Sequence, residues 1–481
     1  MSPADAQWWS DAIVYQVYPR SFQDSDGDGI GDLRGVTSRL DHLAWLGVDA
    51  LWLSPIYPSP LADMGYDVAD HVAVAPEYGT LADLDELVAG AHARGIRVLL
   101  DLVPSHTSIE HPWFREHPDW YVWSEDGPAN NWVASFGGSA WSRDERTGRW
   151  YLHSFYPEQP DLNWRNGDVR SAFAEVVRFW TERGIDGFRI DAIDRIMKDA
   201  ALRDDPPATE PFPFPAPAEY AALDHVHSLN DPDVALALAA LREAAGDSFL
   251  VGEVYLRAHQ LGPYLEHLDL AFAFELPHGS FEADRLRDVI ATAAATGQAA
   301  WVLSNHDFPR IATRVGESRA ALAAMLLLTL PGAAFVYQGD EIGMVDGPGA
   351  DPPVDRAGRD PHRHPMQWEP APGGGFTTGR PWLPLTDPGG PSVAGQRGRP
   401  GSMLELYREL IALRREMRGP LEMLESEPMV LAYRRGEHVV ALNLGAATVP
   451  APATGEPLVA VGPVSGAGDS LPGCGGFVLR S

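Results

Sequence analysis

Three acidic side chains follow short apolar stretches of the sequence, and their type and position suit catalysis. These residues are Asp191, Glu253 and Asp307. Arg189 stands two residues before Asp191, so in a strand both side chains would point to the same face. Because an unpaired buried charge is costly, the pair must neutralise each other, meet water or take part in chemistry. An ordinary ion pair at a strand end is the alternative interpretation.

Carboxyl groups gathered in this way could hydrolyse a glycosidic bond. Hydrolysis with retention needs one carboxylate as nucleophile and one carboxylic acid that protonates the leaving oxygen, roughly 5 to 5.5 Å apart. A third fixed anion can support the positive, oxocarbenium-like sugar ring. Phosphate chemistry is less favoured, because the sequence has no Gly-Lys-Ser/Thr loop and no Gly-x-Gly-x-x-Gly at a strand-to-helix turn.

A loop rich in Asp and Gly follows the first predicted strand and could hold a hard cation. Alternating carboxylates separated by glycines can wrap oxygen ligands around Ca²⁺, and without a counterion they would repel one another. The spacing is similar to the start of an EF-hand, but Gly35 stands where that loop needs Glu. The predicted calcium ligands are Asp24, Asp26, Asp28, Asp32 and the backbone oxygen of Ile30. A solvated acidic turn is the alternative.

Alternating strand and helix patterns predict the elements that position these residues. The expected strands are Ile13–Tyr18, Ala50–Leu53, Val98–Leu102, the strand at Gly187, Phe249–Gly252, Leu270–Glu275, Trp301–Ser304 and Ala334–Tyr337. The expected helices are Leu33–Leu46, Leu81–Arg94, Val169–Arg183, Pro232–Ala245, Glu282–Ala295, Arg319–Thr329 and Met403–Glu416. This rhythm favours an α/β fold in which a parallel barrel gathers the three carboxylates at one rim.

Two segments depart from the rhythm. The stretch 111–164 carries many tryptophans and no clear helix, so we expect an inserted lid domain in which most tryptophans form core and one or two contact substrate. Residues after 429 alternate like short strands and predict a terminal β domain. The predicted domains are a first barrel part, 1–104, the lid, 105–165, a second barrel part, 166–420, and a C-terminal β domain, 421–481.

Composition narrows the partners and the compartment. The 481-residue chain has a net charge of −30, which disfavours nucleic acid and anionic membranes and suits a small neutral substrate. Its single cysteine, Cys474, suits a reducing compartment, and the first 15 residues show no secretory signal, so we expect a cytoplasmic protein. The apolar stretch Ala320 to Val336 is short and contains Pro331, which favours a helix followed by a strand over a membrane span.

Short motifs in a fixed order along nearly the whole chain carry a family resemblance. They include Tyr15-Gln-Val-Tyr-Pro-Arg-Ser-Phe22, Gly65-Tyr-Asp67, Asp101-Leu-Val-Pro-Ser-His106, Gln159-Pro-Asp-Leu-Asn163, Gly187-Phe-Arg-Ile-Asp191, Gly252-Glu253, Ser304-Asn-His-Asp307 and Pro365-Met-Gln-Trp368. The sequence resembles the α-amylase family of glycoside hydrolases, in particular its α-glucosidase and oligo-1,6-glucosidase branch. The resemblance implies a (β/α)8 TIM barrel with an inserted lid domain after strand 3 and a C-terminal antiparallel β domain.

The resemblance also implies residue roles. Asp191 would be the nucleophile, Glu253 the acid/base and Asp307 the transition-state stabiliser. The residues implied to hold the first glucose are Asp67, His106, Arg189 and His306, with Asp67 and Arg363 capping its non-reducing end. Arg359, one helical turn from Arg363, is the alternative cap. Independently, a cation at Arg189 should keep Asp191 ionised, whereas Glu253 needs an apolar or anionic setting that raises its pKa.

Departures from the family pattern refine the expected activity. Ser105 before His106 argues against the calcium site of calcium-dependent α-amylases, and no Lys-His pair follows Asp191, which argues against an endo-acting amylase. Ala192 after the nucleophile favours an α-1,4 over an α-1,6 linkage. We therefore expect a retaining exo-acting α-glucosidase for maltose and short maltooligosaccharides. The alternatives are an oligo-1,6-glucosidase, a sucrose hydrolase, a transglycosylase or isomerase, and a non-catalytic binding module; the oligomeric state stays open.

Overall fold

A closed barrel of parallel strands forms the centre of the protein. The computed structural model describes residues 7–462, 464 and 469–480. The barrel order is β1-β11-β10-β9-β8-β7-β3-β2. The strands are β1 (Ile13–Val17), β2 (Ala50–Leu53), β3 (Arg97–Leu102), β7 (Gly187–Ile190), β8 (Phe249–Gly252), β9 (Leu270–Phe272), β10 (Ala299–Val302) and β11 (Ala333–Tyr337). The predicted α/β barrel is therefore confirmed.

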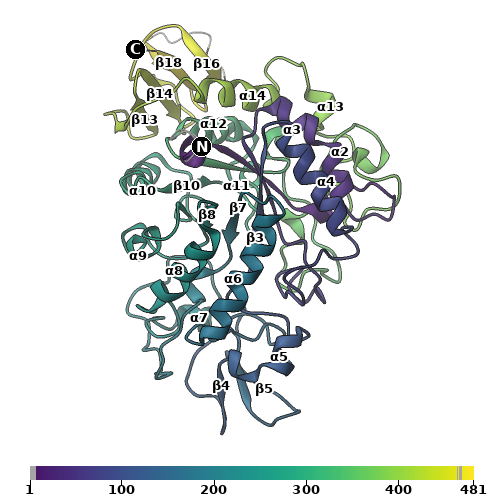
Figure 1. The fold of residues 1–481 in the computed structure, drawn as a ribbon. Helices are drawn as coiled ribbons and strands as arrows, with labels where there is room; N and C mark the ends of the chain where they lie inside the picture. The colour runs from purple at the N-terminus through teal and green to yellow at the C-terminus, as the bar shows by residue number, and fades with distance from the viewer. Residues whose placement is uncertain (1–6, 463, 465–468, 481) are drawn as a thin grey trace.

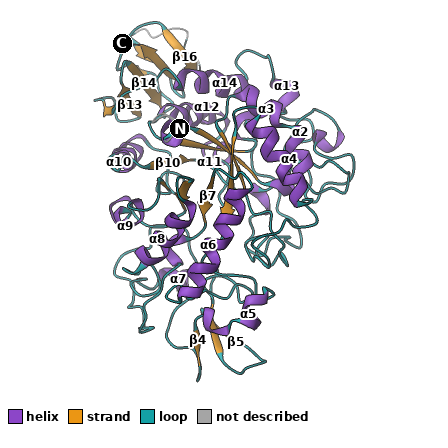
Figure 2. Ribbon diagram, in the orientation of Figure 1, coloured by secondary structure: helices purple, strands orange, loops and turns teal. Residues whose placement is uncertain are grey.

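Helices surround the strands, which gather at the centre of the view in Figure 2. The helices outside the lid are α2 (Leu33–Ser38), α3 (Leu40–Leu46), α4 (Leu81–His92), α6 (Gly167–Glu182), α7 (Ala218–Ala221), α8 (Val234–Ala245), α9 (Gly262–Leu265), α10 (Ala283–Ala294), α11 (Ile311–Val315), α12 (Glu317–Thr329), α13 (Val393–Gln396) and α14 (Met403–Arg414). Among the described residues, no helix is both long enough and apolar enough to cross a bilayer.

The single helix predicted over Leu33–Leu46 is wrong, because the chain breaks at Arg39 between α2 and α3. The hydroxyls of Thr37 and Ser38 donate to the backbone oxygens of Leu33 and Gly35 at 2.9 and 2.6 Å. Hydroxyls that bond back to the preceding turn compete with the backbone ladder and bend or end helices. The apolar period continues across the break, which is why the sequence pattern does not show it.

Two apolar cores hold the barrel together. Inside it, Trp52, Phe249, Phe272 and Phe335 form a cluster with smaller side chains. A larger cluster lies between the strands and the surrounding helices. Because both faces of each strand are covered, β1 is buried along its whole length and its sequence is nearly continuously apolar.

The segment between β3 and α6 forms the predicted lid. It contains α5 (Pro112–Glu116) and a small sheet, ordered β4-β6-β5, made of β4 (Trp123–Ser124), β5 (Trp141–Arg143) and β6 (Trp150–Leu152). Trp132 and Trp141 are buried in a separate core with Leu152. Among the described residues, no tryptophan lines the large cavity described below, so the tryptophan contact with substrate stays a prediction that the cavity lining does not support.

A terminal β domain lies at the opposite end of the molecule from the lid (Figure 1). Its main sheet is antiparallel, in the order β12-β13-β14-β18-β16. The terminal strands are β12 (Leu421–Met423), β13 (Val430–Arg435), β14 (His438–Asn443), β15 (Val449–Pro450), β16 (Pro457–Val461), β17 (Ser470–Leu471) and β18 (Gly476–Arg480). Residues 1–6 of the predicted first barrel part, and 463, 465–468 and 481 of the predicted β domain, lie outside the described residues.

Candidate active site

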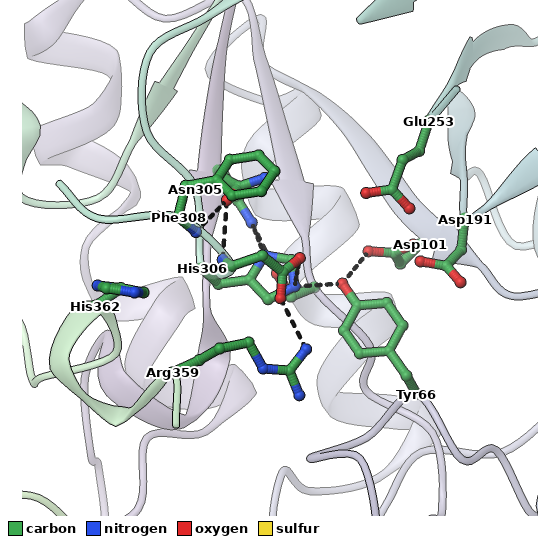
Figure 3. A network of polar contacts seen from close by, with 12 residues as sticks. Tyr66, Asp101, Asp191, Glu253, Asn305, His306, Phe308, Arg359 and His362 are labelled. Carbon is green, nitrogen blue, oxygen red and sulfur yellow. Dashed lines mark hydrogen bonds and ion pairs between the residues drawn. The ribbon is translucent and has the colours of Figure 1, made fainter. Parts of the chain in front are cut away.

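The three predicted carboxylates meet at the carboxyl ends of the barrel strands. Asp191 and Glu253 each come directly after a strand, and the two strands β7 and β8 pair in parallel with Ile190 opposite Gly252. Asp307 follows the end of β10. All three carboxylates line one cavity of about 890 Å³. Figure 3 shows the Asp191 and Glu253 carboxyl groups pointing toward the same space.

One buried guanidinium group serves three carboxyl groups. Arg189 contacts Asp101 at 2.7 Å, Asp191 at 2.6 Å and Glu253 at 2.7 Å. All four side chains are at least nine-tenths buried. Because one cation faces three acids in a site of low dielectric, full ionisation of all three is unfavourable, and the group retains a proton near neutral pH.

Glu253 is the member of this group that best retains the proton. Burial raises the pKa of Glu253 to about 8, with the charges of Asp191 and Asp307 adding to the effect and Arg189 opposing it. Its carboxyl group accepts hydrogen bonds from the backbone N–H of Ala192 at 2.9 Å and the Tyr255 hydroxyl at 3.2 Å. At pH 7 Glu253 is therefore mostly a carboxylic acid, the form that a general acid needs.

Asp191 differs from the sequence expectation. Burial raises the pKa of Asp191 to about 7, and the charge of Asp101 adds to this effect. Arg189 lowers the Asp191 pKa, as predicted, but it does not outweigh burial. The prediction that Arg189 keeps Asp191 ionised is corrected, because the guanidinium is shared with Asp101 and Glu253.

Asp307 lies in a cationic environment. Arg359 and Arg363 contact its carboxylate at 3.0 and 3.1 Å, and His306 lies 3.1 Å away. Burial alone would raise the pKa of Asp307, but His306, Arg359 and Arg363 together bring it below its ordinary value. Asp307 is therefore a fixed anion, whereas Glu253 retains its proton.

The two predicted histidines are both buried. His306 lies near the rings of Tyr18 and Tyr66, with centroids 5.8 and 5.4 Å away, and the Tyr66 hydroxyl contacts its Nε2 at 2.7 Å. His106 lines the cavity, and its Nε2 lies 3.0 Å from the side-chain nitrogen of Gln159. Burial lowers the pKa of both histidines, so they are neutral at pH 7.

Asp67 does not lie where the family resemblance implied. Its carboxylate accepts hydrogen bonds from the Ser59 hydroxyl at 2.7 Å and from the N–H groups of Ala62 and Asp63 at 2.8 and 3.0 Å. Asp67 is fully buried and ties this turn together. Asp63, four residues earlier, lines the cavity and forms an ion pair with Arg359. Of the two carboxylates, Asp63 therefore faces the cavity and Asp67 does not.

The two candidate cap arginines, Arg359 and Arg363, lie in different surroundings. Arg359 lines the cavity, whereas Arg363 is completely buried behind Asp307 and donates to the backbone oxygen of His306 at 2.9 Å. Arg189 and His306 are likewise 1% and 0% exposed. These three side chains contact the carboxylates and their neighbours and do not line the cavity, so their contact with sugar stays a prediction.

Sequence reasoning missed two residues that shape the site. Asp101 is the last residue but one of β3 and stands opposite Arg189 in the β3–β7 register. Its signal was an acid at the end of an apolar run, the same pattern that identified Asp191 and Glu253. Asp63 had a weaker signal, because it stands just before the Gly65-Tyr-Asp67 motif and spacing does not show which of Asp63 and Asp67 faces the cavity.

The acidic loop brings part of the predicted calcium ligand set together. One carboxylate oxygen from each of Asp24, Asp26 and Asp28 lies within 4.8 Å of the others. Asp32 has another role, since it caps α2 by accepting from Gly35 N–H at 2.7 Å. Ile30 donates its N–H to Asp28 at 2.7 Å. Three hard oxygen donors at this spacing fit Ca²⁺, and both Asp24 and Asp32 also accept backbone hydrogen bonds within the loop.

Comparison with known sequences agrees with this geometry. A sequence profile described as "Alpha amylase, catalytic domain" matches residues 16–420. A probable alpha-glucosidase from Rhizobium meliloti (strain 1021) is 41% identical over 483 aligned residues, which cover 90% of this chain and 87% of the relative. An oligo-1,6-glucosidase from Halalkalibacterium halodurans is 37% identical, with coverage of 89% and 88%.

Solved structures show the same architecture. The crystal structure of an alpha-glucosyl transfer enzyme, XgtA, superposes with a TM-score of 0.92 at 36% identity, covering 98% of this chain and 99% of the other. The trehalulose synthase MutB from Pseudomonas mesoacidophila MX-45 superposes with a TM-score of 0.88 at 31% identity, with the same coverage. With its barrel, its rim of carboxylates and these relatives, the chain belongs to the α-amylase family of glycoside hydrolases.

Proposed function

We propose that this chain is a retaining, exo-acting α-glucosidase that releases terminal glucose from maltose and short maltooligosaccharides. The observation that carries the proposal is the opposite protonation of two acids in one cavity. Glu253 retains its proton at pH 7, while Asp307 is ionised. A protonated acid next to a nucleophilic carboxylate and a fixed anion matches the needs of retaining glycoside hydrolysis.

In the proposed first step, Glu253 gives its proton to the glycosidic oxygen, and the bond from that oxygen to C1 of glucose breaks. A carboxylate oxygen of Asp191 forms a new bond to C1, while Asp307 stabilises the positive charge on the ring. In the second step, water attacks C1, Glu253 takes a proton from the water, and the bond to Asp191 breaks. Asp191 and Glu253 both contact the guanidinium of Arg189, so their carboxyl groups lie close together, as a retaining pair requires.

Contacts around the Asp63–Arg359 ion pair support an exo mode. Both residues of the pair line the cavity. Arg356, from the same loop as Arg359, forms two hydrogen bonds of 3.1 and 3.0 Å with Glu158 of the lid. These contacts join the lid to the loop beside a single sugar site, whereas an endo-acting enzyme needs a groove that continues past it.

The α-1,4 preference rests on Ala192, which lines the cavity directly after the nucleophile. One side chain changes such a preference by about 1–3 kcal/mol, so other linkages should be cleaved more slowly rather than rejected. The relatives named oligo-1,6-glucosidase, alpha-glucosyl transfer enzyme and trehalulose synthase define the second candidates, which are α-1,6 hydrolysis and glucosyl transfer or isomerisation.

We also propose that Asp24, Asp26 and Asp28 bind a structural Ca²⁺. Their loop contacts the 377–382 segment. The Thr377 hydroxyl donates to the Asp24 carboxylate, and the backbone N–H of Trp382 donates to the backbone oxygen of Gly29 at 3.0 Å. A cation there would neutralise the repulsion among the three acids and hold the two segments together. We further infer a cytoplasmic location from the single Cys474, which cell fractionation with an antibody would test.

Incubation with maltose, isomaltose and sucrose tests the proposed activity. We expect glucose from maltose at the highest kcat/KM, and proton NMR should show α-glucose before mutarotation. Asp191→Asn should remove turnover, whereas Asp247→Asn, at an exposed position before β8, is the matched control. Release of β-glucose first would refute retention, and no glucose from any of the three sugars would favour the non-catalytic binding module.

A further inference from the structure

A second cavity lies at the other end of the barrel from the three carboxylates. Its lining includes Ile13 at the start of β1, Asp49 directly before β2 and Gly332 directly before β11. The three carboxylates instead follow the carboxyl ends of strands in the same parallel barrel. The cavity has a volume of about 460 Å³, within the usual range of small-molecule sites. It is therefore separate from the proposed active site and large enough for a small ligand.

The lining of this second cavity has an excess of positive charge. Its charged side chains, among the described residues, are four arginines and two aspartates: Arg414, Arg415, Arg418, Arg435, Asp11 and Asp49. They come from the segment before β1, the loop before β2, the end of α14 and the end of β13 in the terminal β domain. At neutral pH the arginines outnumber the aspartates by two charges, in a chain whose net charge is −30.

Two of the four arginines also have a structural role. Arg414 donates to the backbone oxygens of Leu328 and Leu330 at 3.0 and 2.6 Å, and Arg435 donates to the oxygen of Leu330 at 3.0 Å. These oxygens belong to the last turn of α12 and the residue after it, where backbone oxygens have no partner within the helix. Burial, with a smaller contribution from the charge of Arg435, lowers the pKa of Arg414 to about 10. An added anion would favour the charged form of both side chains.

Asp11 is the shared partner of three arginines. Its carboxylate oxygens lie 3.1 Å from Arg414, 3.0 Å from Arg418 and 2.5 Å from Arg435. One carboxylate cannot balance three guanidinium groups, so the excess positive charge lies around Asp11. The Nε of Arg435 is buried and has no hydrogen-bond partner among the described residues. A buried donor of this kind is costly unless a ligand or water accepts from it.

The other two arginines keep N–H groups for a ligand. Arg415 makes both of its hydrogen bonds to described residues through Nη2, one of them to Asp49 at 3.0 Å. Arg418 makes all three of its hydrogen bonds to described residues through Nη1. The two side chains are 55% and 66% exposed, so the remaining N–H groups of each guanidinium face solvent or the cavity. A ligand can reach them without breaking contacts within the protein.

We propose that this cavity binds a small phosphate monoester, with its phosphate group held by Arg415, Arg418 and the Nε–H of Arg435. At pH ~7.5 a phosphate monoester is mostly a dianion, which would balance the two excess positive charges. The forked N–H groups of a guanidinium match the oxygens of phosphate. The cavity volume leaves room for the organic part of the ester. The bound ester would connect the barrel, α14 and the terminal β domain without competing for the active site.

Calorimetric titration with glycerol 3-phosphate at low ionic strength tests this inference. We expect saturable binding of one glycerol 3-phosphate per chain and a melting temperature that rises with its concentration. Glycerol, which lacks the phosphate, should not bind. The absence of saturable binding to the wild type, or equal binding of glycerol, would overturn the inference.

Three variants locate the site. Arg418→Gln removes an exposed charge and its N–H groups and should weaken binding about tenfold or more. Asp49→Asn removes a competing carboxylate and should tighten binding about fivefold, a gain that damage to the fold cannot produce. Arg408→Gln, at an exposed position of α14 outside the cavity lining, is the matched control and should bind as the wild type does. Equal affinities in Arg418→Gln and Arg408→Gln, or no gain in Asp49→Asn, would contradict a site in this cavity.

Discussion

The protonation of Glu253 gives a prediction with a definite size. The reactive form of the enzyme has Glu253 protonated and Asp191 ionised. The pKa of Glu253 is raised to about 8 and that of Asp191 to about 7. The fraction of enzyme in this form is largest near pH ~7.5 and falls about sixfold by pH ~6 and by pH ~9. The acid side of the profile belongs to Asp191, since lower pH protonates the nucleophile. The basic side belongs to Glu253, since higher pH removes the proton that it must donate.

Glu253→Gln separates the two sides of the profile. An amide does not titrate, and α-glucosyl fluoride needs no proton on its leaving fluoride. For this variant we expect kcat/KM on the fluoride to fall only at low pH and to stay level between pH ~7.5 and pH ~9. On maltose, which needs the proton, the variant should lose about 10²- to 10⁴-fold.

The assay is the initial rate of fluoride or glucose release at a series of pH values. Glu243→Gln, an exposed position on α8, is the matched control and should keep both sides of the profile. The reasoning would be refuted if Glu253→Gln kept the fall at high pH, because another group would then be responsible for it. A similar loss on maltose and on the fluoride would also contradict an acid role for Glu253.

Three further predictions follow from the contacts around the site. Arg359→Lys keeps the charge but loses the forked contacts with Asp63 and Asp307, so KM for maltose should rise about tenfold or more in steady-state assays. An unchanged KM would show that Arg359 does not bind the sugar. Asp67→Ala leaves three donors in the 59–63 turn without their acceptor and should lower the free energy of unfolding by about 1–3 kcal/mol in urea titrations. A higher KM with an unchanged free energy of unfolding would contradict this structural role. Chelation with EDTA should lower the melting temperature, and added Ca²⁺ should restore it in the wild type but not in Asp26→Asn. A melting temperature that changes with neither EDTA nor Ca²⁺ would argue against the calcium site.

The barrel and the three catalytic candidates could be predicted because two simple rules fix them. Apolar runs with helices between them define parallel strands, and the carboxyl ends of such strands share one rim. Asp191 and Glu253 therefore had to emerge on neighbouring strands, as the pairing of Ile190 with Gly252 shows. These features depend on local sequence pattern and on barrel topology, both of which a single sequence contains.

Contacts between distant loops could not be predicted in this way. Which of Asp63 and Asp67 faces the cavity depends on a turn in which the Asp67 carboxylate accepts hydrogen bonds from the Ser59 hydroxyl and the Ala62 N–H. The raised pKa of Asp191 depends on Asp101, which is brought to Arg189 by strand register rather than by spacing in sequence. The cytoplasmic location, the calcium ion and the oligomeric state are not fixed by these contacts and stay predictions or open questions.

Trapping the covalent intermediate tests the central claim most directly. A fluorinated glucosyl fluoride that forms the intermediate quickly and releases it slowly should add one fluoroglucosyl unit to the intact protein, and peptide mass spectrometry should locate it on the peptide that contains Asp191. Asp191→Asn should take up no label. A label on another residue, or turnover without any covalent label, would contradict an enzyme in which Asp191 attacks the sugar while Glu253 supplies the proton.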